Sequence, residues 1–190
     1  MWRLVIFLSI FPPILAMVLR WWYGIRVLAT RGPRVCRADL DKWLPEPEKT
    51  SVARRSDETA HVIGFHLWQY ALRQWAKDDP KAAAARGKAK RIGTVLPPFT
   101  VLIVAFALVL GKLPLLGAFA LVTGSIALAA LFTCLTLPAE LKEVARAANR
   151  LRKAGAFRLR DDEDAVVECA IAHAWNQSLP PVLRWMQGGG

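Results

Sequence analysis

Two long hydrophobic stretches without a charged residue dominate the pattern of the chain, at residues 94–111 and 115–136. Only Lys112, Leu113 and Pro114 separate them. Each stretch is about as long as a helix must be to cross the roughly 30 Å hydrocarbon layer of a bilayer. Because the connection is so short, the pattern predicts a tight transmembrane helical hairpin.

A third hydrophobic stretch, residues 2–19, contains one charged residue, Arg3. A cleaved signal peptide carries its positive charges ahead of the apolar run, whereas here an arginine cluster follows the run, which favours an uncleaved membrane anchor. The Pro-Pro pair at positions 12 and 13 predicts a kink in this helix. Three aromatic residues follow, where an interfacial aromatic belt is expected: Trp21, Trp22 and Tyr23.

The distribution of charge predicts the orientation of the chain. The net charge is +11, and most of the positive excess lies between residues 20 and 91. Cytoplasmic flanks of membrane helices are enriched in Lys and Arg, so we expect the N-terminus outside and the C-terminus in the cytoplasm. The three cysteines form no CxxC pair and no even disulfide framework, which fits a reducing compartment.

These patterns predict an all-α integral membrane protein with three transmembrane helices, an N-terminal anchor plus the helical hairpin, and cytoplasmic amphipathic helices. We expect four segments in chain order. They are residues 1–30 as the anchor and aromatic belt, 31–92 as a basic cytoplasmic helical segment, 93–136 as the hairpin, and 137–190 as a cytoplasmic helical tail.

Capping signals predict the ends of the helices outside the membrane. Ser56 is the expected N-cap of one helix, and Asp79-Pro80 separates that helix from the next. Pro138 is expected to open a further helix, and Gly155 is expected to end it. The expected helices cover residues 37–44, 56–77, 81–91, 138–155 and 165–178.

The expected helix over residues 81–91 is strongly basic. Each Lys or Arg near an anionic membrane surface contributes about 1 kcal/mol. We therefore expect anionic lipid headgroups to be contacted by Lys81, Arg86, Lys88, Lys90 and Arg91. Nucleic-acid binding is the competing interpretation, but no aromatic or fold signature of such a domain accompanies the charge, so no nucleic acid is expected as a partner.

The segment His61-Val62-Ile63-Gly64-Phe65 is the main candidate for chemistry. An HExxH zinc hydrolase needs two histidines at i and i+4 on one helix face and a Glu after the first histidine as general base. Here Val62 stands in place of the base, and Phe65 stands in place of the second ligand. His66 is rotated by about 140° from His61 on a regular helix, so the two cannot share one ion. Cys169 and His173, four residues apart, are a weaker metal-binding candidate, with packing as the alternative.

Two groups of residues around this segment carry a family resemblance. Ala60, His61 and Gly64 match an A-H-E-x-G-H motif. A T-L-P-x-E-F-D-A-S-x-R-A motif after the membrane helices is matched in order by Thr136, Leu137, Pro138, Glu140, Arg146 and Ala147. With its anchor and membrane hairpin, the chain resembles the bacterial membrane-bound neutral zinc metallopeptidases of the YugP type. The resemblance implies that His61 and Glu140 are vestigial metal positions and that the chain lies in the bacterial cytoplasmic membrane.

We therefore predict a metallopeptidase-like membrane protein without catalytic residues, bound metal or cofactor, acting as a structural or accessory subunit of a larger membrane complex. The alternatives are a zinc-dependent membrane metallopeptidase with an atypical site and a membrane-surface module that binds anionic lipid. Transport is disfavoured because the hairpin stretches contain no ionisable residue. Other membrane subunits are expected to be contacted by Trp68, Trp75, Gly117 and Gly124.

Overall fold

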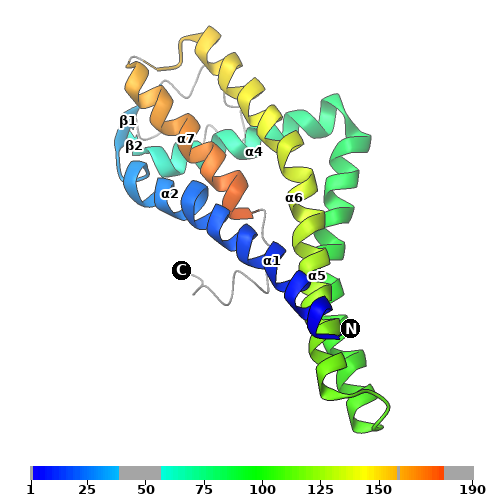
Figure 1. Cartoon of the computed structure of the whole chain (residues 1–190). Helices are drawn as coiled ribbons and strands as arrows, with labels where there is room; N and C mark the ends of the chain where they lie inside the picture. Colours follow the sequence, from blue (N-terminus) through cyan, green and yellow to red (C-terminus); the bar gives the residue numbers. More distant parts are fainter. Residues whose placement is uncertain (1, 39–56, 158, 178–190) are drawn as a thin grey trace. The chain divides into compact units, whose positions relative to one another are not determined.

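The computed structural model describes residues 2–38, 57–157 and 159–177 (Figure 1). Most of these residues are helical. In chain order the elements are α1 (Trp2–Arg20), η1 (Trp21–Ile25), α2 (Arg26–Arg31), β1 (Val35–Arg37), β2 (Asp57–Thr59), α4 (Ala60–Asp78), α5 (Pro80–Val109), α6 (Leu115–Ala154) and α7 (Arg160–Gln177). The predicted helical class is confirmed, apart from a small antiparallel sheet that pairs β1 with β2.

Three helical stretches are long and apolar enough to cross a membrane: Phe7–Arg31, Pro80–Val109 and Leu115–Ala154. They correspond to the anchor and the two arms of the hairpin. The hairpin turn lies at Gly111, which has a φ of +66°. A positive φ is open to glycine without steric cost, so this residue lets the chain reverse within a few positions.

The described residues form two compact units. The first unit contains α1 and residues 84–137. The second contains η1, α2, the two strands, α4, the first turn of α5 and residues 138–176.

Small residues allow the helices of the first unit to approach closely. Ala16 of α1 and Ala130 of α6 are buried in one cluster. A Cβ placed on Gly93 of α5 would lie 3.2 Å from the Thr133 methyl of α6. Large apolar side chains point outward instead. Phe106, for example, is 68% exposed. Such a distribution is typical of helices whose outer faces meet lipid rather than water.

Other elements of the second unit pack against helix α7 on several sides. A Cβ on Gly64 of α4 would lie 2.6 Å from the Cys169 Cβ and 3.0 Å from the Ala170 amide nitrogen. On another side, a Cβ on Gly24 of η1 would lie 3.4 Å from the Ala172 carbonyl oxygen. Two glycines on different elements therefore let α4 and η1 pack directly on the α7 backbone.

The start of α4 differs from the prediction. Asp57–Thr59, expected in the first helical turn, forms strand β2, and the helix begins at Ala60. Its first amides donate to backbone carbonyls: Ala60 N to Arg34 O at 2.7 Å and His61 N to Gly32 O at 3.2 Å. These carbonyl oxygens accept hydrogen bonds from the first helical amides, the role expected of the Ser56 side chain. The expected helix over 37–44 is wrong at its first residue, since Arg37 lies in β1, and its residues 39–44 lie outside the described part of the chain.

The predicted helix start at Pro138 is also wrong. Helix α6 continues through Pro138 from Leu115 to Ala154. Prolines are tolerated inside helices near membranes where neighbouring groups take up the carbonyls that they free. The predicted end at Gly155 is confirmed: its φ is +61°, and the Ala156 amide donates back to Leu151 O.

Candidate functional site

His61 is the second residue of α4, and its side chain is exposed. The next position is Val62, so no carboxylate follows His61 on the helix. Phe65, one turn later, is half-buried, as is His66. The histidine that comes close to His61 belongs to another helix, α7.

His173 of α7 pairs with His61 at the centre of the site. The two imidazole centroids lie 4.7 Å apart. His173 Nε2 is 3.1 Å from the backbone carbonyl oxygen of His61, and because a carbonyl only accepts, Nε2 carries the proton and donates. Burial lowers the pKa of His173 from 6.5 to about 4, although the bond to the His61 carbonyl works in the opposite direction. His173 is therefore a neutral, buried structural donor at physiological pH.

Two aromatic rings of α4 enclose the His173 imidazole. Phe65 meets it edge-on, with centroids 5.3 Å apart. Trp68 lies nearly parallel to it, with centroids 6.5 Å apart. The residue at the position of the expected second metal ligand thus packs against an imidazole instead of supplying one.

Glu140 of α6 makes a short hydrogen bond within the second unit. The Trp68 indole Nε1 donates to Glu140 Oε1 at 2.6 Å. Both residues are buried, with 7% of Trp68 and 5% of Glu140 exposed. A charge-assisted bond of this kind is about twice as strong as a neutral one. It ties α4 to α6 through the carboxylate that the resemblance assigns to a metal.

These side chains do not fit a zinc ion. A zinc site needs three or four ligands converging on one point. Within the described residues, no group of three His, Cys, Asp or Glu side chains could hold a metal ion. That includes the pair Cys169 and His173, because Cys169 packs against Gly64 while His173 turns to His61.

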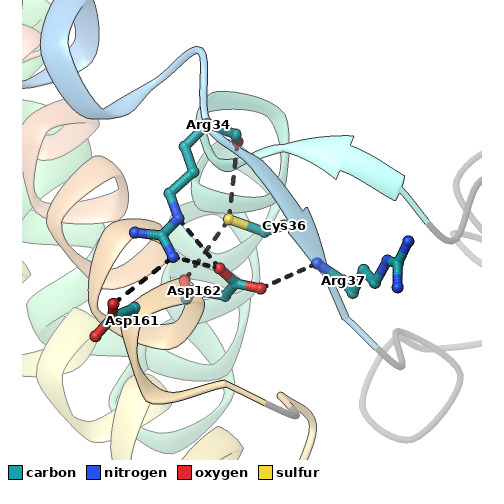
Figure 2. A network of polar contacts seen from close by, with 5 residues as sticks. All are labelled: Arg34, Cys36, Arg37, Asp161 and Asp162. Atoms are coloured by element: carbon teal, nitrogen blue, oxygen red, sulfur yellow. Dashed lines mark hydrogen bonds and ion pairs between the residues drawn. The ribbon is translucent and has the colours of Figure 1, made fainter.

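An ionic cluster fixes the N-terminal end of α7 (Figure 2). Arg34 Nε donates to Asp162 Oδ1 at 3.1 Å, and Arg34 Nη2 lies 2.9 Å from the same oxygen. The Arg37 amide donates to Asp162 Oδ2 at 3.3 Å. Acidic residues are favourable at this end of a helix because its unpaired amides carry partial positive charge. The cluster holds the strand β1 against α7.

Two cysteines of the second unit are fully buried: Cys36, which contacts this cluster, and Cys169. Burial raises the pKa of each thiol from 9.0 to about 11. Thiolate is the reactive form of cysteine, so neither residue is suited to act as a nucleophile. Both are packing residues of the second unit.

The predicted partner residues behave differently from one another. Trp68 and Trp75, expected to contact another subunit, are buried in the second unit and leave little surface for such a contact. Gly117 packs against Leu113 and Pro114 of the hairpin turn, and a Cβ on Gly124 would lie 3.8 Å from Ser9 Oγ. Both glycines thus serve contacts within the first unit.

The predicted membrane-surface residues are accessible to different degrees. Lys81, Lys88 and Arg91 are exposed on α5, whereas Arg86 and Lys90 are half-buried. Trp21, Trp22 and Tyr23 are each about half exposed on η1. The sequence singled out His173 and Trp68 but missed their contacts with His61 and Glu140, because these partners lie more than 70 residues away.

No family model matches the chain, and no curated protein or solved structure matches it. The likeness to the YugP-type metallopeptidases therefore stays a prediction that rests on the motif residues.

Proposed function

We propose that this chain is a non-catalytic, metallopeptidase-like membrane protein that acts as a structural or accessory subunit of a larger membrane complex. The observation that carries the proposal is the Trp68–Glu140 hydrogen bond, which engages the motif carboxylate in joining two helices. Phe65 packing on His173 supports it, because an aromatic contact fills the place of the second ligand. The proposed location is the bacterial cytoplasmic membrane, with the N-terminus outside.

Two measurements on the full-length protein, extracted in a mild detergent, test this proposal. We expect elemental analysis to find no stoichiometric zinc, and we expect size measurement to find the 21.1 kDa chain in a larger assembly. Bound zinc with metal-dependent peptide cleavage would support the atypical metallopeptidase instead. A 21.1 kDa chain without partners under the same conditions would contradict the accessory role.

Exposure along α5 favours a second candidate function, binding of anionic lipid. Helix α5 runs without a break from Pro80 into the apolar stretch that begins at Thr94. At about 1.5 Å per residue, Arg91 and Lys88 lie about 5 and 9 Å from Thr94, within or just beyond a headgroup layer about 5–8 Å thick. Lys81 lies about 20 Å away, beyond one Debye length of about 8 Å. The proposed lipid contacts therefore centre on Lys88 and Arg91.

A liposome experiment separates these positions. We expect Lys88→Gln with Arg91→Gln to reduce enrichment of anionic lipid around the reconstituted protein, while Lys81→Gln has little effect. Equal effects of the two changes would contradict a headgroup site on α5. Neither result depends on the accessory-subunit proposal.

A further inference from the structure

Helix η1 presents aromatic side chains on the outside of the second unit. Trp21 is 51% exposed and Trp22 is 50% exposed, with ring centroids 6.0 Å apart. The opposite side of η1 is packed, because Gly24 is buried against α7 and Tyr23 stacks on Trp175 at 5.2 Å. η1 is a π-helical turn, a rare element that is frequent at functional sites. Two neighbouring indoles are thus half exposed on one side of η1.

Arg26 completes this surface. Its guanidinium carbon lies 4.4 Å from the centroid of the Trp22 ring. Nearby arginines are neutralised, since Arg31 pairs with Glu168 and Arg34 pairs with Asp162. Among the described residues, no carboxylate pairs with Arg26. Arg26 is exposed, and a guanidinium that stacks on an aromatic ring can still bind a phosphate group through its edge.

The chain leads to this surface from an apolar helix. The candidate membrane span Phe7–Arg31 exposes apolar residues such as Val18 before it reaches the two tryptophans. Arg26 follows Trp22 by about 6 Å along the helix, close to the thickness of a headgroup layer, about 5–8 Å. Apolar, aromatic and basic side chains thus occur in the order of hydrocarbon, interface and headgroup.

We propose that the η1 surface, defined as Trp21, Trp22 and Arg26, is where the second unit binds the membrane, with Arg26 holding the phosphate of an anionic phospholipid. Trp22 provides the platform that orients the guanidinium, and its indole lies at the level of the upper acyl chains. The basic residues of α5 are not part of this surface. It does not depend on whether the chain is an accessory subunit.

Full-length protein in nanodiscs of phosphatidylcholine and phosphatidylglycerol tests the proposal. Bromine atoms attached near the top of the acyl chains quench the fluorescence of tryptophans at that depth. We expect Trp22→Phe to remove a large share of this quenchable tryptophan fluorescence. Trp75→Phe, which changes a buried ring, should leave that share unchanged. We expect Arg26→Gln to lower retention of phosphatidylglycerol two- to five-fold, while Lys153→Gln, an exposed control on α6, retains it as the wild type does.

Two outcomes would overturn the proposal. One is equal bromine quenching in Trp22→Phe and the wild type, which would place the surface against protein or water. The other is equal phosphatidylglycerol retention in Arg26→Gln and Lys153→Gln. Since Trp22 is 50% exposed and Arg26 is also exposed, circular dichroism of both variants should match the wild type and exclude unfolding as the cause.

Discussion

His173 is a buried imidazole that donates a hydrogen bond, and this role makes folding sensitive to acid. Burial lowers its pKa to about 4 in the folded protein, from the usual 6.5 of a solvated histidine, so the unfolded chain binds a proton more readily. The contribution of this residue to stability is therefore complete above pH 6.5 and is lost as the pH falls toward 4. A shift of this size corresponds to about 3 kcal/mol.

We expect His173→Gln, which keeps a donor for the His61 carbonyl, to lose less stability than the wild type between pH 6.5 and 4. Thermal unfolding followed by tryptophan fluorescence at several pH values measures this difference. His66→Gln leaves His173 in place and should keep the wild-type slope. Parallel pH profiles for wild type and His173→Gln would refute the assignment of this acid sensitivity to His173.

Gly64 sets the distance between α4 and α7. In Gly64→Ala the new methyl would lie 2.6 Å from the Cys169 Cβ and 3.0 Å from backbone atoms of α7, so the helices must move apart. We expect a loss of about 1–3 kcal/mol from overpacking. Gly87→Ala is the matched control, since nothing lies within 4 Å of its Cβ, and it should be neutral or stabilising by up to about 1 kcal/mol. Denaturant unfolding of both variants decides the point.

Trp68 and Glu140 should be coupled energetically. Trp68→Phe removes the indole donor from a buried carboxylate, and hydrogen bonds to charged groups contribute about 1.5–3 kcal/mol. We expect Trp68→Phe to lower the free energy of unfolding by that order in the wild type and by less in a Glu140→Gln background. A double-mutant cycle gives the coupling, and Trp75→Phe reports the cost of ring volume alone. A coupling near zero would remove the support that this bond gives to the proposed function.

At the scale of elements, the first turn of α7 depends on one carboxylate more than on its neighbour. The Asp162 side chain is 6% exposed and bonds Arg34 and the Arg37 amide, whereas the Asp161 side chain is 81% exposed and lies 3.9 Å from Arg34. We expect Asp162→Asn to cost about 2 kcal/mol or more and Asp161→Asn to cost under about 1 kcal/mol. Equal melting temperatures of the two variants would contradict this ranking.

Local sequence signals predicted some element boundaries and missed others, for physical reasons. The helix end at Gly155 and the hairpin turn were predictable, because a glycine with a positive φ ends a helix or reverses the chain at its own position. The start of α4 was not, because its cap comes from carbonyls of Gly32 and Arg34, nearly 30 residues earlier. The start expected at Pro138 failed because α6 accommodates a proline inside the helix.

The same distinction applies to the candidate site. The departures of Val62 and Phe65 from the HExxH pattern can be read directly from the sequence. The pairing of His61 with His173, and of Trp68 with Glu140, depends on how three helices pack, and no local pattern carries that information. The burial of Trp68 and Trp75 was missed because helical periodicity does not reveal what covers an apolar face.

At the scale of the whole molecule, the predicted orientation can be tested by labelling. Lys112 is exposed at the hairpin turn and Lys153 is exposed near the end of α6. In intact bacterial cells we expect a membrane-impermeant maleimide to label Lys112→Cys, and to label Lys153→Cys only after permeabilisation. Buried Cys36 and Cys169 should contribute little background because burial raises the pKa of both thiols. Labelling of Lys153→Cys in intact cells would contradict the predicted orientation.

The second unit is assembled from two separate stretches of chain, and the hairpin lies between them in sequence. During translation, α4 leaves the ribosome before the hairpin, whereas α7 emerges last among the described helices. The apolar side of α4, with Ile63 and Leu67, must therefore wait uncovered until the hairpin has been synthesised and α7 can dock. Nascent chains stalled before residue 160 should accordingly be held by chaperones and degraded by proteases, and longer ones should escape both.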